Sequence, residues 1–122
     1  MIDHVSIGVR DLAASAAFYD AVLAAIGLDR LVTRERTVGY GKKYPEFWIN
    51  HRAGFVQSGD EGGVHVCLRA RERAQIDAFH QAALDAGGTG AGAPGPRPEY
   101  SETYYAAFIR DPDGNKVEAV TF

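Results

Sequence analysis

The chain has 122 residues, of which 46% are hydrophobic, and 13 Lys and Arg against 16 Asp and Glu give a formal net charge of -3. These values are typical of one globular domain, and the lack of a basic stripe excludes nucleic acid as an expected partner. A single cysteine excludes an internal disulfide, and no apolar run approaches the roughly 18 residues of a membrane span. We therefore expect a cytoplasmic protein with no membrane partner.

The chain begins with a strand pattern followed by a helix pattern. Residues 2–9 alternate between apolar side chains and polar or small ones, which predicts a half-buried strand. Asp11 is a favourable N-cap and Gly27 a favourable helix stop, so we predict a helix over about residues 12–26. The apolar stripe of this helix would contain Phe18, Val22, Leu23 and Ile26. Short strands are predicted near residues 29–34, 37–42 and 46–50.

The first part of the chain recurs in the second. Identical residues lie 61 positions apart (65 minus 4) along residues 4–27, so that His4 corresponds to His65 and Phe18 to Phe79. Such a repeat indicates a duplicated unit of about sixty residues. We therefore predict a single α+β domain over residues 1–122, built from two tandem βαβββ modules. Module one would cover about 1–50, a linker about 51–62, and module two about 63–122.

The second module repeats the strand and helix patterns. A strand is predicted around residues 64–69 and a helix over about 72–86, ended by Gly87 and Gly88. The inward-facing residues of this helix would be Ile76, Phe79, Ala83 and Leu84.

The end of the chain contains a loop and a hairpin. Residues 87–101 predict a weak strand followed by a stiff, irregular loop, because the prolines at 94, 96 and 98 cannot all lie in a hydrogen-bonded ladder. The strand-like runs 104–110 and 116–122 flank the sequence DPDGN at 111–115, which is a strong hairpin signal.

Two histidines and a glutamate form a candidate metal site. His4 and His65 occupy the same place in the two modules, on the polar face of each first strand, and would converge if the modules pair about a pseudo-twofold axis. In the last strand, the side chain of Glu118 points to the other face of the sheet from those of Val117 and Ala119. A carboxylate buried there needs a partner. Two His and one carboxylate suit Fe, Mn, Ni, Co or Zn with open coordination positions. The alternative is a polar cluster of structural value only.

Three further residues of suitable chemistry lack such support. His51 lies at a strand end and His80 corresponds to Tyr19 on a helix, so both are expected to be surface or structural residues. Cys67 shares a face with His65 and is expected to be a buried, inert thiol.

The two ends of the chain resemble a known family. The opening signature of the vicinal oxygen chelate superfamily, which includes glyoxalases, bleomycin resistance proteins and extradiol dioxygenases, is similar to residues 2–12, IDHVSIGVRDL. Its closing signature is similar to residues 108–118, FIRDPDGNKVE. The resemblance covers nearly the whole chain. It implies paired βαβββ modules curled into a cupped mixed sheet around one divalent metal ion, with ligands from the first and last strands of each module.

The resemblance implies His4, His65 and Glu118 as ligands, but the expected fourth ligand differs. Trp48 aligns with Glu118 in module one, and Trp cannot bind a metal ion; Glu46 or Asn50 could supply an oxygen only in a slipped register. Glyoxalase I has a second Glu at this place and methylmalonyl-CoA epimerase a Gln, and both catalyse proton transfers. A three-ligand set is more similar to extradiol dioxygenases or fosfomycin-resistance thiol transferases, although no phosphonate cradle of Lys and Arg is evident. Bleomycin-binding members use the same cup without a metal.

The favoured hypothesis is a metal-dependent enzyme, a lyase, dioxygenase or thiol transferase, in which the ion chelates a small oxygen-bearing substrate through two oxygens. Phe47, Trp48, Tyr104 and Tyr105 are candidates to line the substrate pocket, and core packing is the alternative for at least two of them. The second hypothesis is a non-catalytic protein that sequesters a drug or toxin. Open strand edges predict a homodimer, and the metal site could lie within one chain or be shared by two.

Overall fold

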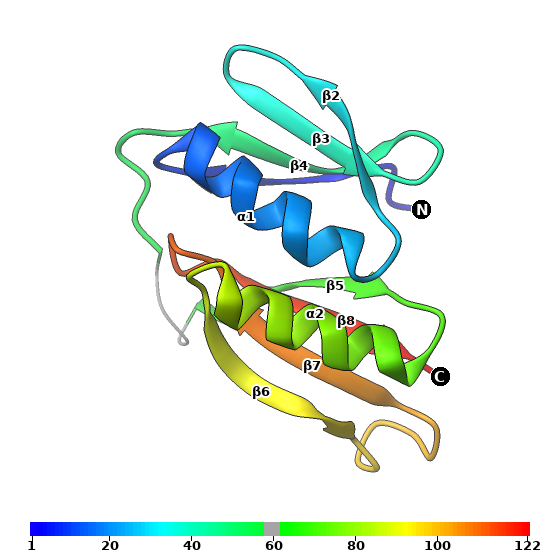
Figure 1. Ribbon diagram of the computed structural model, residues 1–122. Coiled ribbons are helices and arrows are strands. Elements are labelled where there is room, and N and C mark those ends of the chain that lie inside the picture. Colours follow the sequence, from blue (N-terminus) through cyan, green and yellow to red (C-terminus); the bar gives the residue numbers. More distant parts are fainter. Residues whose placement is uncertain (58–61) are drawn as a thin grey trace.

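The computed structural model describes residues 1–57 and 62–122 and consists of two modules with the same order of elements (Figure 1). Module one contains β1 (Val5–Val9), α1 (Leu12–Ala24), β2 (Asp29–Thr33), β3 (Thr37–Gly41) and β4 (Pro45–His51). Module two contains β5 (Val66–Arg69), α2 (Arg73–Asp85), β6 (Thr89–Pro96), β7 (Tyr105–Arg110) and β8 (Lys116–Thr121). The predicted fold of two βαβββ modules is therefore confirmed. Part of the predicted linker at 51–62, residues 58–61, lies outside the described residues.

The two sheets have equivalent topologies. Their strand orders are β1-β4-β3-β2 and β5-β8-β7-β6, and in each sheet the first strand pairs in parallel with the last. Ser6 is opposite Trp48 in the first sheet, and Cys67 is opposite Glu118 in the second. Because Ser6 and Cys67 are 61 positions apart, Trp48 occupies the place of Glu118, as the sequence predicted.

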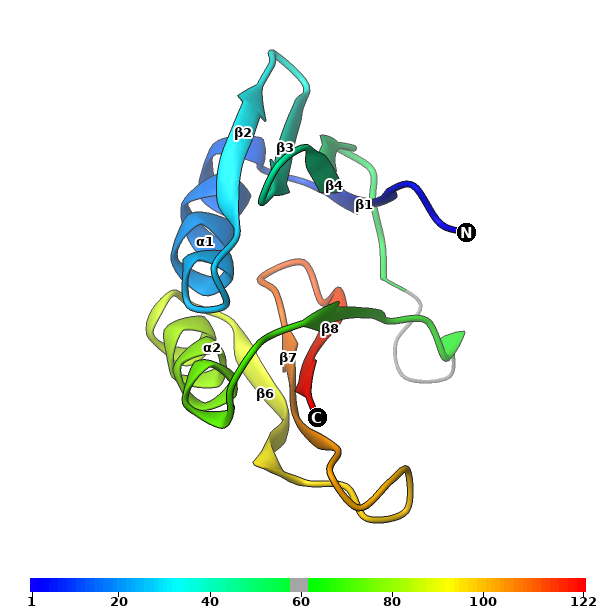
Figure 2. The same cartoon turned by 90° about the vertical axis from the view of Figure 1, so that its right-hand side faces the viewer.

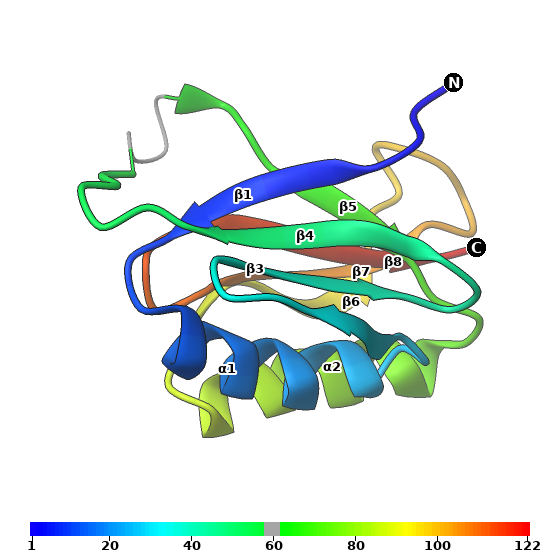
Figure 3. The same cartoon turned by 90° about the horizontal axis from the view of Figure 1, so that it is seen from above.

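The core lies between the two sheets and contains both helices. Figure 2 shows α1 and α2 next to each other at the left, with the strands of module one above and those of module two below, and Figure 3 shows both helices along the same side of the strands. Asp11 caps α1 by accepting a hydrogen bond from the backbone N–H of Ala14, and Gly27, with φ of 82°, follows its end. The predicted stripe of α1 and three of the four residues predicted for α2 are buried: Phe18, Val22, Leu23, Ile26, Ile76, Phe79 and Ala83. The polar faces of both sheets therefore point away from the core.

Two predictions about the helix and strands of module two were wrong. Leu84 is exposed because it follows Ala83 by one residue, which is about 100° of helical rotation, and so leaves the stripe defined by Ile76 and Ala83. Strand β6 continues through Pro94 and Pro96 instead of giving way to a loop. It is an edge strand with irregular pairing to β7. Prolines are tolerated there because the outer side of an edge strand needs no backbone N–H donors for a ladder.

The turn between β7 and β8, residues 111–115, holds the two modules together. Its side chains form hydrogen bonds with module one, and the three shortest are Tyr19 Oη to Asp111 Oδ2 (2.7 Å), Arg10 Nε to Asp113 Oδ1 (2.8 Å), and Asn115 Nδ2 to the backbone oxygen of Gly8 (2.9 Å). We call this set of contacts the module joint. The sequence predicted the hairpin but not its role as the joint. None of the described helices is long and apolar enough to cross a membrane.

Candidate active site

Glu118 is the central polar group of module two. Alternation along β8 places Val117 and Ala119 in the core and turns Glu118 to the opposite face of the sheet, away from the helices. Only 2% of Glu118 is exposed, since it lies between its neighbours in the ladder, Cys67 of β5 and Phe108 of β7. A buried carboxylate of this kind requires partners for both oxygens.

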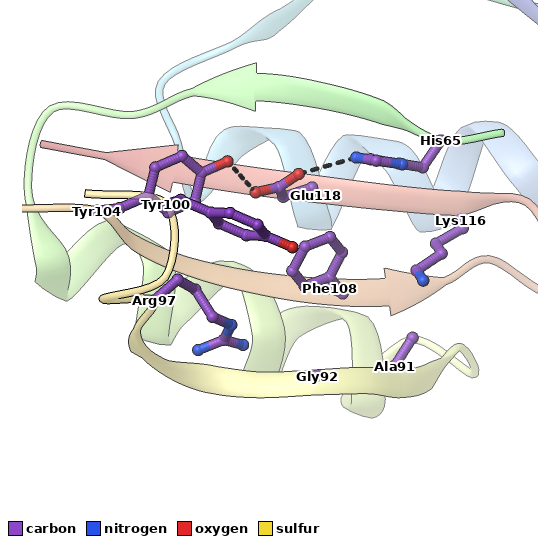
Figure 4. Close-up of a pocket in the computed structure, with 9 residues that line it drawn as sticks. All are labelled: His65, Ala91, Gly92, Arg97, Tyr100, Tyr104, Phe108, Lys116 and Glu118. Carbon is purple, nitrogen blue, oxygen red and sulfur yellow. Dashed lines mark hydrogen bonds and ion pairs between the residues drawn. The ribbon is translucent and has the colours of Figure 1, made fainter. Parts of the chain in front are cut away.

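Two side chains satisfy the Glu118 carboxylate (Figure 4). His65 Nε2 lies 2.9 Å from Oε2, and the Tyr104 hydroxyl donates a short hydrogen bond to Oε1. Desolvation and the hydrogen bond to Glu118 raise the pKa of Tyr104, so the phenol stays protonated and remains a donor at neutral pH. The result is a glutamate held by one imidazole and one phenol.

The third group beside Glu118 is Cys67, which differs from the prediction. It is exposed on the edge strand β5 instead of being buried. Local desolvation of the sulfur, with the nearby Glu118 carboxylate, raises the pKa of the Cys67 thiol to about 12. The thiol is therefore protonated at neutral pH and is not an activated nucleophile.

This cluster forms one wall of a pocket of about 680 Å³. Figure 4 shows Arg97 and Lys116 on either side of the Phe108 ring, with Glu118 and His65 above it. The Arg97 guanidinium carbon lies 5.7 Å from the ring centroid of Phe108, and Lys116 Nζ lies 5.2 Å from it. The lining residues are His65, Ala91, Gly92, Arg97, Tyr100, Tyr104, Phe108, Lys116 and Glu118. The volume suits a small organic ligand.

His4 lies in a different pocket of the same chain. It immediately precedes β1, on the outward face of the first sheet, where its Nδ1 is 2.7 Å from Asp3 Oδ2. One pocket lined by His4, of about 520 Å³, also contains Trp48 and Arg34, whose guanidinium carbon is 5.4 Å from the indole ring centroid, and a second, of about 360 Å³, is shared with Cys67. The structure therefore brings His65 and Glu118 together but does not bring His4 to them within one chain.

The His65–Glu118 pair has a spacing that a metal ion could accept. Two ligand atoms about 2.1 Å from one ion and at right angles to each other are about 3.0 Å apart. The 2.9 Å between His65 Nε2 and Glu118 Oε2 fits such a pair as well as it fits a hydrogen bond. Within residues 1–57 and 62–122 of a single chain, no three His, Cys, Asp or Glu side chains cluster as a metal site. One chain thus supplies two of the three predicted ligands at a suitable distance.

The four aromatic residues predicted for the substrate pocket divide into two pairs. Trp48 lines the pocket of His4, and Tyr104 lines the pocket of Glu118. Phe47 is instead fully buried, 5.2 Å from the ring centroid of Tyr19, and Tyr105 donates a hydrogen bond to Asp77 of α2. Phe47 and Tyr105 are adjacent in sequence to the pocket residues Trp48 and Tyr104. Because side chains alternate along a strand, they point to the helix side of the sheet.

Sequence reasoning missed most of the other pocket residues, among them Phe108, Lys116 and Arg97. Phe108 could have been found, because it alternates with the buried Ala107 and Ile109 and so shares the Glu118 face. Lys116 could have been found in the same way, because it precedes Glu118 by two residues on β8 and so shares its face. Arg97 follows the proline-containing strand β6, where no periodic pattern indicates which way a side chain points.

The comparisons with known proteins agree with the fold. The family model of the Glyoxalase/Bleomycin resistance protein/Dioxygenase superfamily matches residues 1–119. The chain belongs to this superfamily. A glyoxalase/bleomycin resistance protein from Albidiferax ferrireducens T118 is similar over 97% of this chain and 95% of its own, with 35% identity and a TM-score of 0.84. No curated protein sequence matches the chain.

More distant structures share the fold of this superfamily member. A putative glyoxalase from Bacillus halodurans is 23% identical over 98% of this chain and 94% of its own, with a TM-score of 0.71. A lactoylglutathione lyase from Agrobacterium tumefaciens is 22% identical over 98% of this chain and 92% of its own, with a TM-score of 0.67. At these identities the likeness concerns the fold alone.

Proposed function

We propose that the protein is a divalent-metal-dependent enzyme that acts on a small oxygen-bearing substrate in the pocket around Glu118. The observation that carries the proposal is the His65–Glu118 pair, with its 2.9 Å separation between donor atoms, on the wall of a ligand-sized pocket. Membership in a superfamily that contains metal-dependent lyases and dioxygenases supports it. The reaction itself stays unassigned.

We propose further that His4 of a second copy of the chain completes the site. The internal repeat makes His4 and His65 equivalent, and their two pockets lie on outward faces that the core does not close. β1 and β5 are edge strands, so each module offers an open edge to another copy. A twofold dimer that pairs module one of each chain with module two of the other would form two identical sites.

Each residue of the site would have a distinct part in this chemistry. A bound divalent ion would supply Lewis acidity toward two neighbouring substrate oxygens. Tyr104 fixes the orientation of Glu118 by its hydrogen bond to Oε1, which leaves Oε2 beside His65 for binding. Phe108 and the rings of Tyr100 and Tyr104 provide the apolar surface over which the body of the substrate lies.

Metal content tests this proposal. The protein is purified without a polyhistidine tag, reconstituted with Fe(II), Mn(II), Ni(II), Co(II) or Zn(II), and passed through a desalting column. We expect about one retained ion per chain, lost in Glu118→Gln and His65→Ala. The matched control is His80→Ala, on α2 and outside the pocket lining, which should retain the ion. Equal metal content in His80→Ala and His65→Ala would refute the proposal.

The second candidate is a non-catalytic protein that sequesters a small molecule. It is favoured by the absence of an uncommitted general base among the pocket-lining residues, where the carboxylate and the imidazole are already paired. Ligand affinity that is unchanged by metal removal, with no turnover of any bound compound, would support this candidate over the enzyme.

A further inference from the structure

The pocket around Glu118 contains two cations that pair with no carboxylate. In the described ranges 1–57 and 62–122, no acidic side chain lies within ion-pair distance of Arg97 or Lys116, and both line the pocket. Glu118 is the one acidic residue in the lining, and His65 and Tyr104 already occupy its oxygens. The pocket therefore carries an excess of positive charge although the chain as a whole has a net charge of -3.

We propose that this pocket selects small aromatic carboxylic acids, with the carboxylate attracted by the positive charges of Arg97 and Lys116 and the ring against Phe108. The inference deepens the proposed function, on which it rests for the role of the site, by naming the class of substrate or ligand. It uses residues that the metal hypothesis leaves without a role.

The Arg97 side chain is held in place before any ligand arrives. Its two terminal nitrogens donate hydrogen bonds to backbone oxygens of β6, from Nη1 to Gly95 at 2.9 Å and from Nη2 to Ala93 at 2.8 Å. The Arg97 backbone N–H donates to the oxygen of Tyr104 at 2.8 Å, which closes the hairpin at the same point. A guanidinium fixed in this way retains N–H groups for an oxyanion and loses little rotamer entropy on binding.

Phe108 places the second cation and the apolar surface. Lys116 Nζ lies 5.2 Å from the Phe108 ring centroid, and the pairing of β7 with β8 sets Lys116 opposite Arg110, one step in register from the pair of Ile109 and Val117. Across the pocket, Tyr100 is 62% exposed although its ring centroid is 5.0 Å from that of Tyr104. A planar ring can contact these aromatic side chains while its carboxylate reaches one of the two cations.

The position of Glu118 defines what else the ligand carries. Figure 4 shows the Glu118–His65 pair on one side of the Phe108 ring, and Arg97 and Lys116 at its two ends. A carboxylate with a hydroxyl or carbonyl on the adjacent carbon can contact a cation and the Glu118–His65 pair at once. The class is therefore an aromatic acid with a neighbouring oxygen.

The test uses two probes of nearly equal shape, 2-hydroxybenzoate and the neutral 2-hydroxybenzamide, in isothermal titration with protein freed of metal by a chelator. We expect the carboxylate to bind at least about tenfold more tightly than the amide. Its affinity should fall as the salt concentration increases. Lys116→Gln and Arg97→Gln should each weaken carboxylate binding about tenfold and leave amide binding unchanged. Lys43→Gln, at the exposed turn between β3 and β4, is the matched control and should bind as the wild type.

Equal affinities for the two probes, equal affinities in Lys116→Gln and Lys43→Gln, or no binding at millimolar concentrations would overturn the inference. Because the titration is done without metal, its failure is distinct from failure of the proposed function, which the metal content of Glu118→Gln decides. Circular dichroism of each variant shows that lost binding is not lost folding.

Discussion

Replacing Tyr19 with Phe removes one hydroxyl from the module joint and leaves the ring in place. The hydroxyl donates to Asp111 Oδ2 at 2.7 Å, and both residues are buried, with 0% of Tyr19 and 4% of Asp111 exposed. Asp111 Oδ2 would keep a single partner, Asn115 Nδ2 at 2.9 Å. The packing of the ring against Phe18 and Phe47, with centroids 5.0 and 5.2 Å away, would persist.

The expected cost follows from the charge of the acceptor. Hydrogen bonds to charged groups contribute roughly 1.5–3 kcal/mol, more than neutral ones, and no water can easily replace the hydroxyl at a buried site. We therefore expect Tyr19→Phe to lower the free energy of unfolding by about 2 kcal/mol. Equilibrium urea unfolding at one fixed protein concentration measures this change, and the m-value should stay the same because the surface exposed on unfolding does not change.

Tyr44→Phe is the matched control for this measurement. Tyr44 is 53% exposed, so loss of its hydroxyl should change the free energy of unfolding by less than about 0.5 kcal/mol. A Tyr19→Phe effect no larger than that of Tyr44→Phe would show that the turn at 111–115 does not hold the modules together, and would refute the reasoning.

Three further predictions concern titration, backbone strain and the metal site. Burial is the main cause that raises the pKa of Asp111 above 3.8, so the stability it contributes is fully present below the unfolded pKa and is lost as pH rises through the folded pKa. Asp111→Asn should therefore lose less stability relative to the wild type at pH 7 than near pH 3 in urea unfolding, whereas a pH-independent difference would contradict this. Gly27→Ala should lower the free energy of unfolding by about 1 kcal/mol because φ is 82° at Gly27, although a Cβ there meets no atom within 4 Å. Gly54→Ala, equally free of contacts, should leave the free energy of unfolding nearly unchanged. Equal effects of the two substitutions would exclude backbone strain as the cause. Tyr104→Phe should weaken metal affinity about 10-fold to 100-fold through the loss of its hydrogen bond to Glu118, and an unchanged metal titration would rule out this orienting role.

Local features of this fold could be predicted because they depend on local rules. The N-cap at Asp11, the stop at Gly27 and the hairpin at 111–115 follow from backbone preferences of single residues and short turns. The equivalence of Trp48 and Glu118 follows from the repeat, which sets the register of β4 and β8 in the same way. The edge position of β6 could not be predicted, because it depends on the order of strands across the sheet.

The site was predicted only in part for a similar reason. A repeat defines each module but not which faces of the two modules meet. In this chain the helix-covered faces meet and form the core, so His4 and His65 point outward on different sheets. Alternation predicted the outward direction of Glu118, while its hydrogen bond from Tyr104 depends on the β6–β7 hairpin, which no periodic pattern describes.

A mixed dimer tests the proposed shared metal site most directly. His4→Ala and Glu118→Gln chains are co-expressed with two different affinity tags, and the heterodimer is isolated through both. In a shared arrangement, one of its two sites contains both substitutions. The other site takes His4 from the Glu118→Gln chain and His65 and Glu118 from the His4→Ala chain, so all three ligands are present. The account predicts about half an ion per chain in the heterodimer and none in either variant alone. No ion in the heterodimer, with about one per chain in the wild type, would contradict a site shared by two copies.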